Sequence, residues 1–433
     1  MNVKERAYYS RNWKVTTPKN IIDLFWMLTK KHRSKLGSVL DLGAGDGRFV
    51  PKSNFDRYLG VEIDKTIIPS ITLTPKIQYQ YGCVFEHEGD NYDTCVGNPP
   101  YLRHNELGVK WRSKIKNRFK SELDLEFDER ANLFTYFITL ALQKTSNNGL
   151  IALLIPYEWT HRPSVKPLRN YIEKNKWNVI VYKLNFTVFE DTFTTASITI
   201  VDKARNDGLW SYRSVDKSGN IKTLKNLTDT ELSPIDYENR GSIWGLRGLS
   251  PGTQKVFTLT EQERKQYKLT RKDVRPCVTT FKHIPDHINI LNRHSFEKYF
   301  INKNQKCWLI RTDKKLTPNL SSYVTNVPVQ IRDTWTCNNR DSWYKYRQHP
   351  VPQLMVTSTF KSKRPQIVIN TIKAVAVGAA MGIHSNKSIN VKLLQNKLIA
   401  SRFYDRILAY ENGLKKIAVR QMNAVLNNIC QNG

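Results

Sequence analysis

The sequence predicts an α/β fold, in which a doubly wound and mostly parallel sheet is followed by a second domain of mixed α+β type. Two patterns indicate this. In residues 1–205, short apolar runs alternate with helical segments, as they do in a doubly wound sheet. After about residue 205 the runs become short and turn-rich, and the alternation stops. With 433 residues, 40% of them hydrophobic, the chain is long enough for domains with cores of their own.

The first elements lead into a glycine-rich turn. Thr16 and Thr17 precede Pro18, which predicts a capped helix start, and apolar residues at helical spacing follow. A short buried strand at residues 38–40 enters the sequence Asp41-x-Gly43-x-Gly45-x-Gly47. Residues 58–64 form a second predicted strand, which ends in acids.

The later elements of the first domain follow the same rhythm. Residues 149–156 are almost wholly apolar, as expected for a central parallel strand. The other predicted elements are a strand at 92–97, an apolar helix at 133–142, and strands at 178–185 and 196–202 that complete the sheet. We therefore place the first domain at residues 1–205, a linker at 206–245 and a second domain at 246–433, in which residues 392–427 have helical spacing.

The charge is large and uneven. Lys and Arg number 68 against 38 acids, a net charge of +30. Residues 1–205 carry 31 basic and 22 acidic residues, a net +9, and the remaining residues carry 37 and 16, a net +21. Such a field favours a polyanionic partner, although a basic soluble surface is the plainer interpretation. The six scattered cysteines form no metal-binding pairs, and the polar amino terminus predicts no signal peptide and a cytoplasmic protein.

The turn at Asp41 to Gly47 predicts a ligand site. It lacks the glycine spacing of a dinucleotide fold and the Gly-Lys-Ser/Thr of a phosphate loop. Its acids Asp41 and Asp46 suit a cationic ligand, and Glu62 ends the next strand, where a carboxylate binds ribose hydroxyls. Glycines alone would be explained by a tight turn, but Glu62 makes the ligand-binding interpretation the stronger one.

The most specific motif is Asn98-Pro99-Pro100-Tyr101, which follows the strand at 92–97. It brings an amide, two rings without an N–H group and an aromatic face to the carboxyl end of a strand. These groups suit a site that holds a flat, amine-bearing group.

Together these motifs resemble those of S-adenosylmethionine-dependent N6-adenine DNA methyltransferases of the gamma-class order, the modification enzymes of type II restriction–modification systems. The resemblance implies a Rossmann-like catalytic domain followed by a target-recognition domain that binds DNA. It also implies that the cofactor, S-adenosylmethionine, is bound by Thr17, Asp41, Gly43, Gly45, Glu62 and Asn98. The family's further acid near the cofactor adenine has no counterpart at residues 81–85, so backbone groups, Glu86 or Glu88 are the alternatives.

The same resemblance assigns the catalytic residues, which are Asn98, Pro99, Pro100, Tyr101 and Phe189. The Asn98 side-chain oxygen and the Pro99 carbonyl would accept hydrogen bonds from the adenine N6 and localise its lone pair for in-line attack. The base would be flipped out of the duplex, with Tyr101 on one face and Phe189, or alternatively Phe193, on the other. This mechanism requires no metal and no covalent intermediate, and Pro276-Cys277 is read as a chance dipeptide.

Several basic stretches are candidates for DNA contact. Eight basic residues between Arg103 and Lys120 follow the catalytic motif, and the run of acids after them predicts a surface cap. In the second domain, residues 335–347 interleave aromatic and basic side chains, and residues 361–364 predict contacts with phosphates rather than bases. A solvated surface is the alternative in each case.

We therefore expect a site-specific DNA adenine-N6 methyltransferase that acts on double-stranded DNA as a monomer. It would protect host DNA beside a separate cognate restriction endonuclease, in the cytoplasm of a prokaryote and at the nucleoid when bound to DNA, with no membrane partner. Two alternatives stay open: an RNA or protein-amide methyltransferase, and an inactive DNA-binding specificity module. The charge of residues 206–433 argues against a protein substrate, and the intact motifs argue against inactivity.

Overall fold

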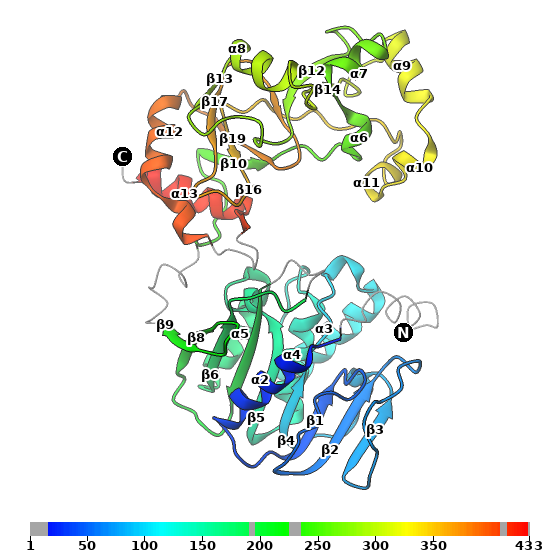
Figure 1. Cartoon of the computed structure of the whole chain (residues 1–433), viewed down its shortest axis with the longest axis vertical. Helices are drawn as coiled ribbons and strands as arrows, with labels where there is room; N and C mark the ends of the chain where they lie inside the picture. Colours follow the sequence, from blue (N-terminus) through cyan, green and yellow to red (C-terminus); the bar gives the residue numbers. More distant parts are fainter. Residues whose placement is uncertain (1–15, 190–194, 225–234, 408–413, 432–433) are drawn as a thin grey trace. The chain divides into compact units, whose positions relative to one another are not determined.

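The computed structural model describes residues 16–189, 195–224, 235–407 and 414–431. These residues form two compact units, the first at 16–224 and the second at 235–431 (Figure 1). None of the helices within the described ranges is long and apolar enough to cross a membrane.

The first unit is built on a nine-stranded sheet in the order β3-β2-β1-β4-β5-β7-β6-β8-β9. The strands are β1 (Gly37–Leu42), β2 (Phe55–Glu62), β3 (Ile77–Tyr81), β4 (Tyr92–Gly97), β5 (Thr145–Pro156), β6 (Asn178–Leu184), β7 (Ala196–Asp202), β8 (Trp210–Val215) and β9 (Ile221–Leu224). Strands β3, β2, β1, β4 and β5 are parallel, β7 is antiparallel to both its neighbours, β8 is parallel to β6, and β9 is antiparallel to β8. The predicted doubly wound α/β fold is confirmed.

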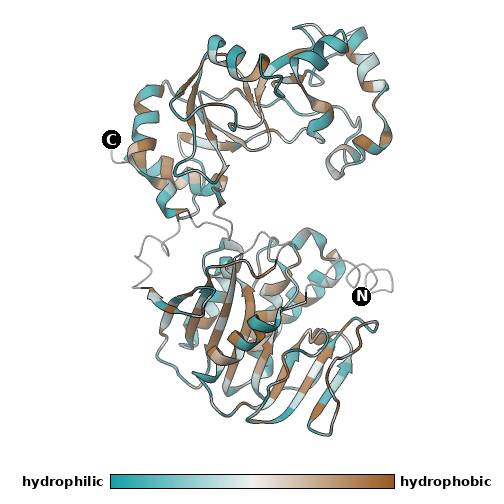
Figure 2. Ribbon diagram, in the orientation of Figure 1, coloured by the Kyte–Doolittle hydropathy of each residue, from teal (hydrophilic) through white to brown (hydrophobic). Residues whose placement is uncertain are grey.

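Helices connect and cover these strands. They are α2 (Lys19–Lys30), α3 (Val109–Leu123), α4 (Leu133–Lys144) and α5 (Lys166–Lys174), with short 3-10 turns η1 (Val84–Glu86), η2 (His104–Glu106), η3 (Tyr157–Thr160) and η4 (Pro163–Val165). Helix α2 buries Phe25 and Leu28 against a sheet face that carries Val39, Leu150 and Leu154. The central strand β5 is buried from Gly149 to its end, and Figure 2 shows the apolar colour concentrated along the central strands.

The segment predicted to be a linker, residues 206–245, contains three strands. Strands β8 and β9 extend the sheet of the first unit, and β10 (Ile243–Arg247) begins the second unit. The sequence prediction missed them because they are short and half-exposed: β9 and β10 lie at sheet edges, and β8 lies next to β9. Strand β9 buries only its last residue, so it lacks the apolar run that marks β5.

The second unit has mixed α+β structure, as predicted. Its three sheets have the orders β10-β19-β15-β17-β13, β11-β14-β12-β18 and β16-β20. The further strands are β11 (Thr258–Leu259), β12 (Val274–Val278), β13 (Ile290–Leu291), β14 (Trp308–Ile310), β15 (Leu354–Thr357), β16 (Thr359–Phe360), β17 (Ile367–Asn370), β18 (Val375–Ala376), β19 (Ala380–Ser385) and β20 (Lys415–Lys416). Two separate hydrophobic cores pack against these sheets, one around Phe257 and Phe300 and one around Leu398 and Met422.

The helices of the second unit are mostly short. They are α6 (Gln254–Phe257), α7 (Glu261–Gln266), α8 (Arg293–Phe296), α9 (Pro318–Thr325), α10 (Val329–Arg332), α11 (Trp335–Asn338), α12 (Val391–Ala400) and α13 (Val419–Gln431). Helix α8 continues into a π-helical turn, Glu297–Ile301, and a 3-10 turn, Phe403–Arg406, follows α12. The helical spacing of residues 392–427 is therefore interrupted: α12 and α13 are separated by β20, and residues 408–413 lie outside the described ranges.

Candidate active site at the carboxyl ends of β1, β2 and β4

Three predicted motifs lie at one edge of the sheet because their strands are parallel neighbours. In the register of the sheet, Asp41 of β1 lies beside Gly60 of β2 and Val96 of β4. The chain leaves β1 at Gly43, β2 after Glu62 and β4 at Asn98, so the glycine turn, the acid and the catalytic motif leave the sheet side by side. Ligands of open α/β sheets bind at this edge.

The glycine turn has a conformation that requires glycine. Gly43, Gly45 and Gly47 have φ values of +77°, +56° and +85°, in the left-handed region that other residues rarely adopt. The N–H groups of Gly43 and Ala44 both donate to the Val61 carbonyl at 3.0 Å, which fixes the turn against β2. A Cβ atom at Gly45 would meet no atom within 4 Å, so the turn leaves open space there.

The Glu62 side chain connects the glycine turn to the end of β2 through hydrogen bonds. Its side chain is 8% exposed, one carboxylate oxygen accepts the N–H of Gly45 at 2.9 Å, and the other accepts the N–H of Asp64 at 2.9 Å. Each carboxylate oxygen accepts more than one hydrogen bond. Glu62 thus supports the turn and keeps acceptor capacity for the hydroxyl groups of a ligand.

Asp41 is a fully buried acid beneath the turn. Its Oδ2 accepts a hydrogen bond from the Tyr58 hydroxyl at 2.6 Å, whereas its Oδ1 is buried with no hydrogen-bond partner. Burial raises the pKa of Asp41 to about 7; the Tyr58 hydrogen bond opposes this rise, and the negative charges of Glu62 and Asp46 add to it. A cation beside Oδ1 would stabilise the charged form, so this acid fits a positively charged ligand.

Asn98 contributes a second unsatisfied acceptor. Its Nδ2 donates to the Thr17 hydroxyl at 3.0 Å, and its Oδ1 is buried without a partner. Thr17 does not cap α2 as the sequence predicted: the N-cap residue is Pro18, and no side-chain cap bond forms. The Thr17 hydroxyl orients the Asn98 amide instead, which leaves Oδ1 to accept a hydrogen bond from an amine.

Two tyrosines of the site were missed by the sequence analysis. Tyr58 holds Asp41, and the hydroxyl of Tyr79 in β3 donates to the Gly45 carbonyl at 2.5 Å. Burial raises the pKa of both phenols, which keeps them neutral donors. A Cβ at Gly60 would lie 2.9 Å from the Ala44 Cβ and 3.1 Å from the Tyr58 hydroxyl. Tyr58, Gly60 and Glu62 are spaced two residues apart and therefore lie on one face of β2. This alternation was the sequence signal that could have identified Tyr58 as a residue of the site.

The two predicted aromatic residues lie next to each other. The Tyr101 hydroxyl donates to the Leu154 carbonyl at 3.1 Å, and the Tyr101 and Phe189 rings meet edge to face with centroids 6.1 Å apart. Phe189 is 6% exposed and belongs to the core beneath the site. The alternative residue, Phe193, lies outside the described residues.

The basic segment after Tyr101 is largely neutralised by the acids that follow it. Arg112 and Lys116 both pair with Glu129, while Arg118 pairs with Glu122 and Lys120 with Asp124. Arg112 also donates to the His104 carbonyl at 2.9 Å, which anchors the segment that leaves the catalytic motif. The net positive charge that this helix offers is therefore smaller than the sequence suggests.

No acid takes the expected place near the end of β3. Residues 84–86 form η1, in which Val84 and Phe85 are buried, and both Glu86 and Glu88 are exposed. The Gly82 N–H donates to the Glu62 carbonyl at 2.8 Å, so η1 begins directly beside the acid that ends β2.

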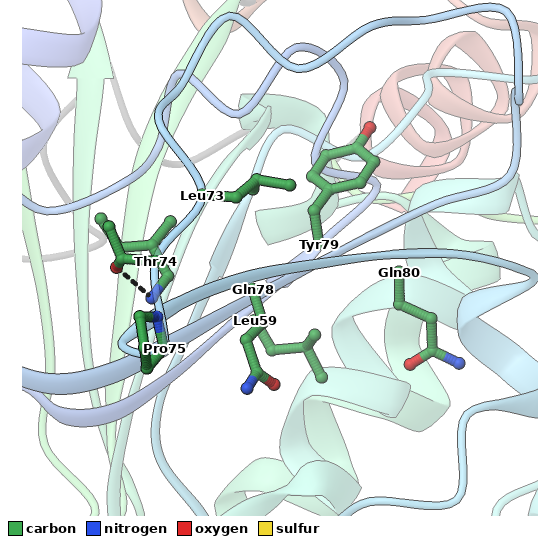
Figure 3. Close-up of a pocket in the computed structure, with 8 residues that line it drawn as sticks. Leu59, Leu73, Thr74, Pro75, Gln78, Tyr79 and Gln80 are labelled. Atoms are coloured by element: carbon green, nitrogen blue, oxygen red, sulfur yellow. Dashed lines mark hydrogen bonds between the residues drawn. The ribbon is translucent and has the colours of Figure 1, made fainter.

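A hollow of about 610 Å³ lies at the outer edge of the sheet rather than at this site (Figure 3). It is lined by residues of β3 and of the turn before it, together with Leu59 of β2. The Thr74 hydroxyl accepts the Ile77 N–H at 3.0 Å within that turn. Strands β2 and β1 separate β3 from the strand that ends before Asn98, and Tyr79 is the residue of the site that also lines this hollow.

The aromatic and basic stretch of the second unit is used mainly for packing. Arg340 donates to the Pro251 carbonyl at 2.6 Å, and the buried Tyr346 hydroxyl donates to the Ile310 carbonyl at 2.7 Å. The Trp343 ring packs edge to face on Phe257. Lys345 and Arg347 are exposed, so the stretch retains few side chains for reading bases.

Comparison with known proteins decides the family. The model of the Eco57I restriction-modification methylase matches residues 52–189, and the model of the C-terminal domain of the Type II methyltransferase M.Eco57I matches residues 245–405. The chain belongs to the type II restriction–modification methylases. The first match contains Glu62, the motif at 98–101 and Phe189, whereas Thr17 and Asp41 lie before it. The cofactor of this methylase is S-adenosylmethionine, and the buried acceptor of Asp41 and the open turn at Gly45 fit it.

Two curated relatives and one solved structure are similar to this chain. The Type II methyltransferase M.AccI of Acinetobacter calcoaceticus is 24% identical over 377 residues, which are 77% of this chain and 68% of that protein. M.XamI of Xanthomonas campestris pv. amaranthicola is 26% identical over 152 residues, 34% of this chain and 28% of that protein. A nuclease-deletion mutant of the Type ISP restriction-modification enzyme LlaGI, solved with a DNA substrate mimic, has a TM-score of 0.49 at 12% identity and covers 98% of this chain and 55% of that chain.

The affinity of the methylase for its cofactor is expected to depend on pH through Asp41. The free protein binds a proton on Asp41 below its pKa of about 7, whereas a bound cation favours the carboxylate and lowers that pKa. The dissociation constant for S-adenosylmethionine should therefore rise by up to about tenfold for each pH unit below 7 and be flat above it. Calorimetric titration from roughly pH 5 to pH 8 measures this.

Asp41→Asn provides the control, because the amide still accepts the Tyr58 hydrogen bond but carries no titratable charge. Its dissociation constant should be higher than that of the wild type and independent of pH. A wild-type constant that does not change between pH 5 and pH 7 would contradict the role of Asp41.

Glu62→Ala is expected to weaken both the fold and the cofactor site. The N–H groups of Gly45 and Asp64 lose their acceptor, which should lower the free energy of unfolding by about 1–3 kcal/mol. Calorimetry should also show a higher cofactor dissociation constant. Asp56→Ala removes an exposed acid from the same strand and should change both quantities little; an unchanged cofactor constant in Glu62→Ala would remove the ligand-binding role of Glu62.

Proposed function

We propose that this methylase transfers the methyl group of S-adenosylmethionine to the N6 amine of adenine in double-stranded DNA. The observation that carries this proposal is the buried, unpartnered Oδ1 of Asn98 at the end of β4. A buried acceptor without a partner costs free energy unless a ligand satisfies it. An exocyclic amine, which offers N–H donors in the plane of a base, is the matching ligand.

In this proposal each residue of the motif has a separate role in the reaction. Asn98 Oδ1 and the Pro99 carbonyl accept the two N–H groups of N6, which directs its lone pair toward the methyl donor. The Thr17 hydroxyl fixes the amide of Asn98 in the orientation that this requires. Pro99 is buried and Pro100 is half-buried, and their rings hold the backbone rigidly and bring no competing N–H group. The bound cofactor supplies an electrophilic methyl group on a sulfonium.

The cofactor would be held by the neighbouring residues. We propose that Asp41 and the turn at Gly43 and Gly45 hold its cationic part and that Glu62 accepts its ribose hydroxyls. Support comes from the open space at Gly45, the unpartnered Oδ1 of Asp41 and the remaining acceptor capacity of Glu62. Catalysis by this arrangement consists of positioning and electrostatic stabilisation.

The target base would leave the duplex, because N6 of a paired adenine is engaged in the helix. We propose that Tyr101 stacks on one face of the flipped base and Phe189 on the other. The edge-to-face contact of these rings leaves no slot between them, so base entry requires one ring to turn. The hydrogen bond from the Tyr101 hydroxyl to Leu154 is the interaction that such a turn would break.

We further propose that residues 246–433 form the target-recognition domain and that the enzyme protects host DNA as a monomer beside a separate cognate endonuclease. The net charge of +21 on residues 206–433 supports a DNA partner. An RNA or protein-amide substrate is the second candidate, because the Asn-Pro-Pro-Tyr motif suits any planar amine or amide. Single-molecule sequencing of DNA from cells with and without the enzyme identifies the modified base and its site; unmodified DNA would favour the second candidate.

Asn98→Ala is expected to lower kcat by at least about a hundredfold, because it removes a preorganised acceptor at the reacting amine. Dissociation constants for DNA should change only a few-fold. Thr17→Val keeps Asn98 and removes its hydrogen-bond partner, so a smaller loss of kcat is expected from it. Single-turnover assays with labelled cofactor measure both; wild-type turnover in Asn98→Ala would exclude the proposed mechanism.

Base flipping is expected to be visible with 2-aminopurine at the target position. Its fluorescence, which is quenched by stacking in a duplex, should rise when the enzyme binds. A matched duplex with 2-aminopurine one base pair away from the target should show no such rise. A productive complex without any rise at the target would contradict flipping.

A further inference from the structure

The second unit contains a basic surface built from three segments that are far apart in the sequence. They are residues 282–287, residues 361–364 and strand β20. Together they carry six Lys or Arg residues and one acid, Asp286. Five of the six are exposed, namely Lys282, Lys361, Lys363, Arg364 and Lys416, and we call these five the basic surface. Lys415 is half-buried and donates to the Tyr404 carbonyl at 2.8 Å.

Tertiary interactions bring the segments together. The Gln366 side chain donates to the carbonyls of Ile284 and Pro285 at 2.7 and 2.9 Å, which places the end of the 361–364 loop against the 282–287 segment. Strand β16 pairs with β20, so Phe360 lies opposite Lys415 and Thr359 opposite Lys416. The three segments are thus joined by side-chain hydrogen bonds on one side of the loop and by strand pairing on the other.

The loop itself has a defined shape. Ser362 donates to the Arg364 carbonyl at 2.7 Å, which closes a tight turn, and the buried Pro365 anchors its end. Lys361, Lys363 and Arg364 are all exposed. Their cationic groups are therefore presented to solvent by a fixed backbone.

The cations of this loop differ from those near the catalytic motif. On α3, four basic residues pair with acids. In the part of the chain that the structure describes, Lys361, Lys363 and Arg364 form no ion pair. A paired cation must give up its partner before it binds a phosphate, whereas these three are free to do so.

We propose that the basic surface binds the phosphate backbone of the DNA duplex and contributes affinity without reading the sequence. This inference rests on the proposed action on DNA and names the surface that holds the duplex. Phosphates rather than bases are assigned because flexible Lys side chains dominate the set and the 361–364 loop is too short to enter a groove as a helix does. Binding of each phosphate releases condensed counterions, so the affinity must fall with salt.

The test measures duplex binding by the full-length protein over a series of salt concentrations. The triple variant Lys361→Ala, Lys363→Ala and Arg364→Ala should reduce the slope of log K against log salt by about 0.9 for each phosphate that is no longer neutralised, or up to about 2.7. The loss of affinity should be the same for cognate and unrelated duplexes, and kcat at saturating DNA should be unchanged.

The control variant removes the same charge elsewhere in the second unit, as Lys265→Ala, Lys272→Ala and Lys303→Ala, all of which are exposed. An equal change of slope in both triples would mean that net charge alone acts, and it would overturn the proposal. An unchanged slope in the first triple would overturn it as well. Lys361→Arg with Lys363→Arg should retain the wild-type slope, because the charge is kept. An unchanged kcat of the alanine triple at saturating DNA shows that its loss of affinity is not a folding defect. Methylation of DNA by the wild type at low salt tests the proposed function separately.

Discussion

The parallel alignment of β1, β2 and β4 is the constraint on which the site depends. Because all three strands run in the same direction and are neighbours, the residues that leave them meet at one edge, although the first and the last are separated by more than fifty positions in the sequence. The turn at Gly43 to Gly47 then needs a left-handed backbone to pass over β2, and Gly60 has no side chain where the turn crosses. A side chain at Gly60 would collide with Ala44 of the turn, whereas a side chain at Gly45 would strain the left-handed backbone.

The buried polar side chains of the site form some of their hydrogen bonds within the protein and keep other acceptor positions without a partner. Glu62 is bound by two backbone N–H groups, Asp41 by the Tyr58 hydroxyl through one oxygen, and Asn98 by the Thr17 hydroxyl through its amide nitrogen. The second oxygen of Asp41 and the amide oxygen of Asn98 have no partner. Each group is thus held in place by the protein, and the remaining acceptors are the ones that we propose a ligand uses. The raised pKa of Asp41 is a consequence of the same arrangement, since burial disfavours its charged form and the Tyr58 hydrogen bond only partly opposes this.

The basic residues also fall into two groups, those that hold the fold and those that are exposed to solvent. After the Asn98 motif, four of the six basic residues of α3 are paired with acids, and Arg112 also holds the His104 carbonyl. In the second unit, Lys361, Lys363 and Arg364 are exposed on a loop whose backbone is fixed. Arg340, in contrast, lies in the stretch richest in aromatic and basic residues and is used to hold the carbonyl of Pro251. Composition alone does not separate a cation that binds a partner from one that holds the fold.

The sequence by itself determined the central strands of the first domain, the glycine turn, and the positions of Glu62 and of the Asn98-Pro99-Pro100-Tyr101 motif at strand ends, because each depends on local backbone chemistry: strand periodicity, positive φ at glycine and rigid proline rings. The edge strand β9 and its neighbour β8 could not be predicted, since half-exposed strands carry no apolar run. The hydrogen bonds of Tyr58, Tyr79 and Thr17 depend on which strands become neighbours. Only the tertiary structure decided that Thr17 orients Asn98 rather than capping α2, and that segments near residues 284, 364 and 415 form one basic surface. The physical reason is that hydrogen bonds and ion pairs between distant residues are fixed by strand pairing, which no local pattern encodes.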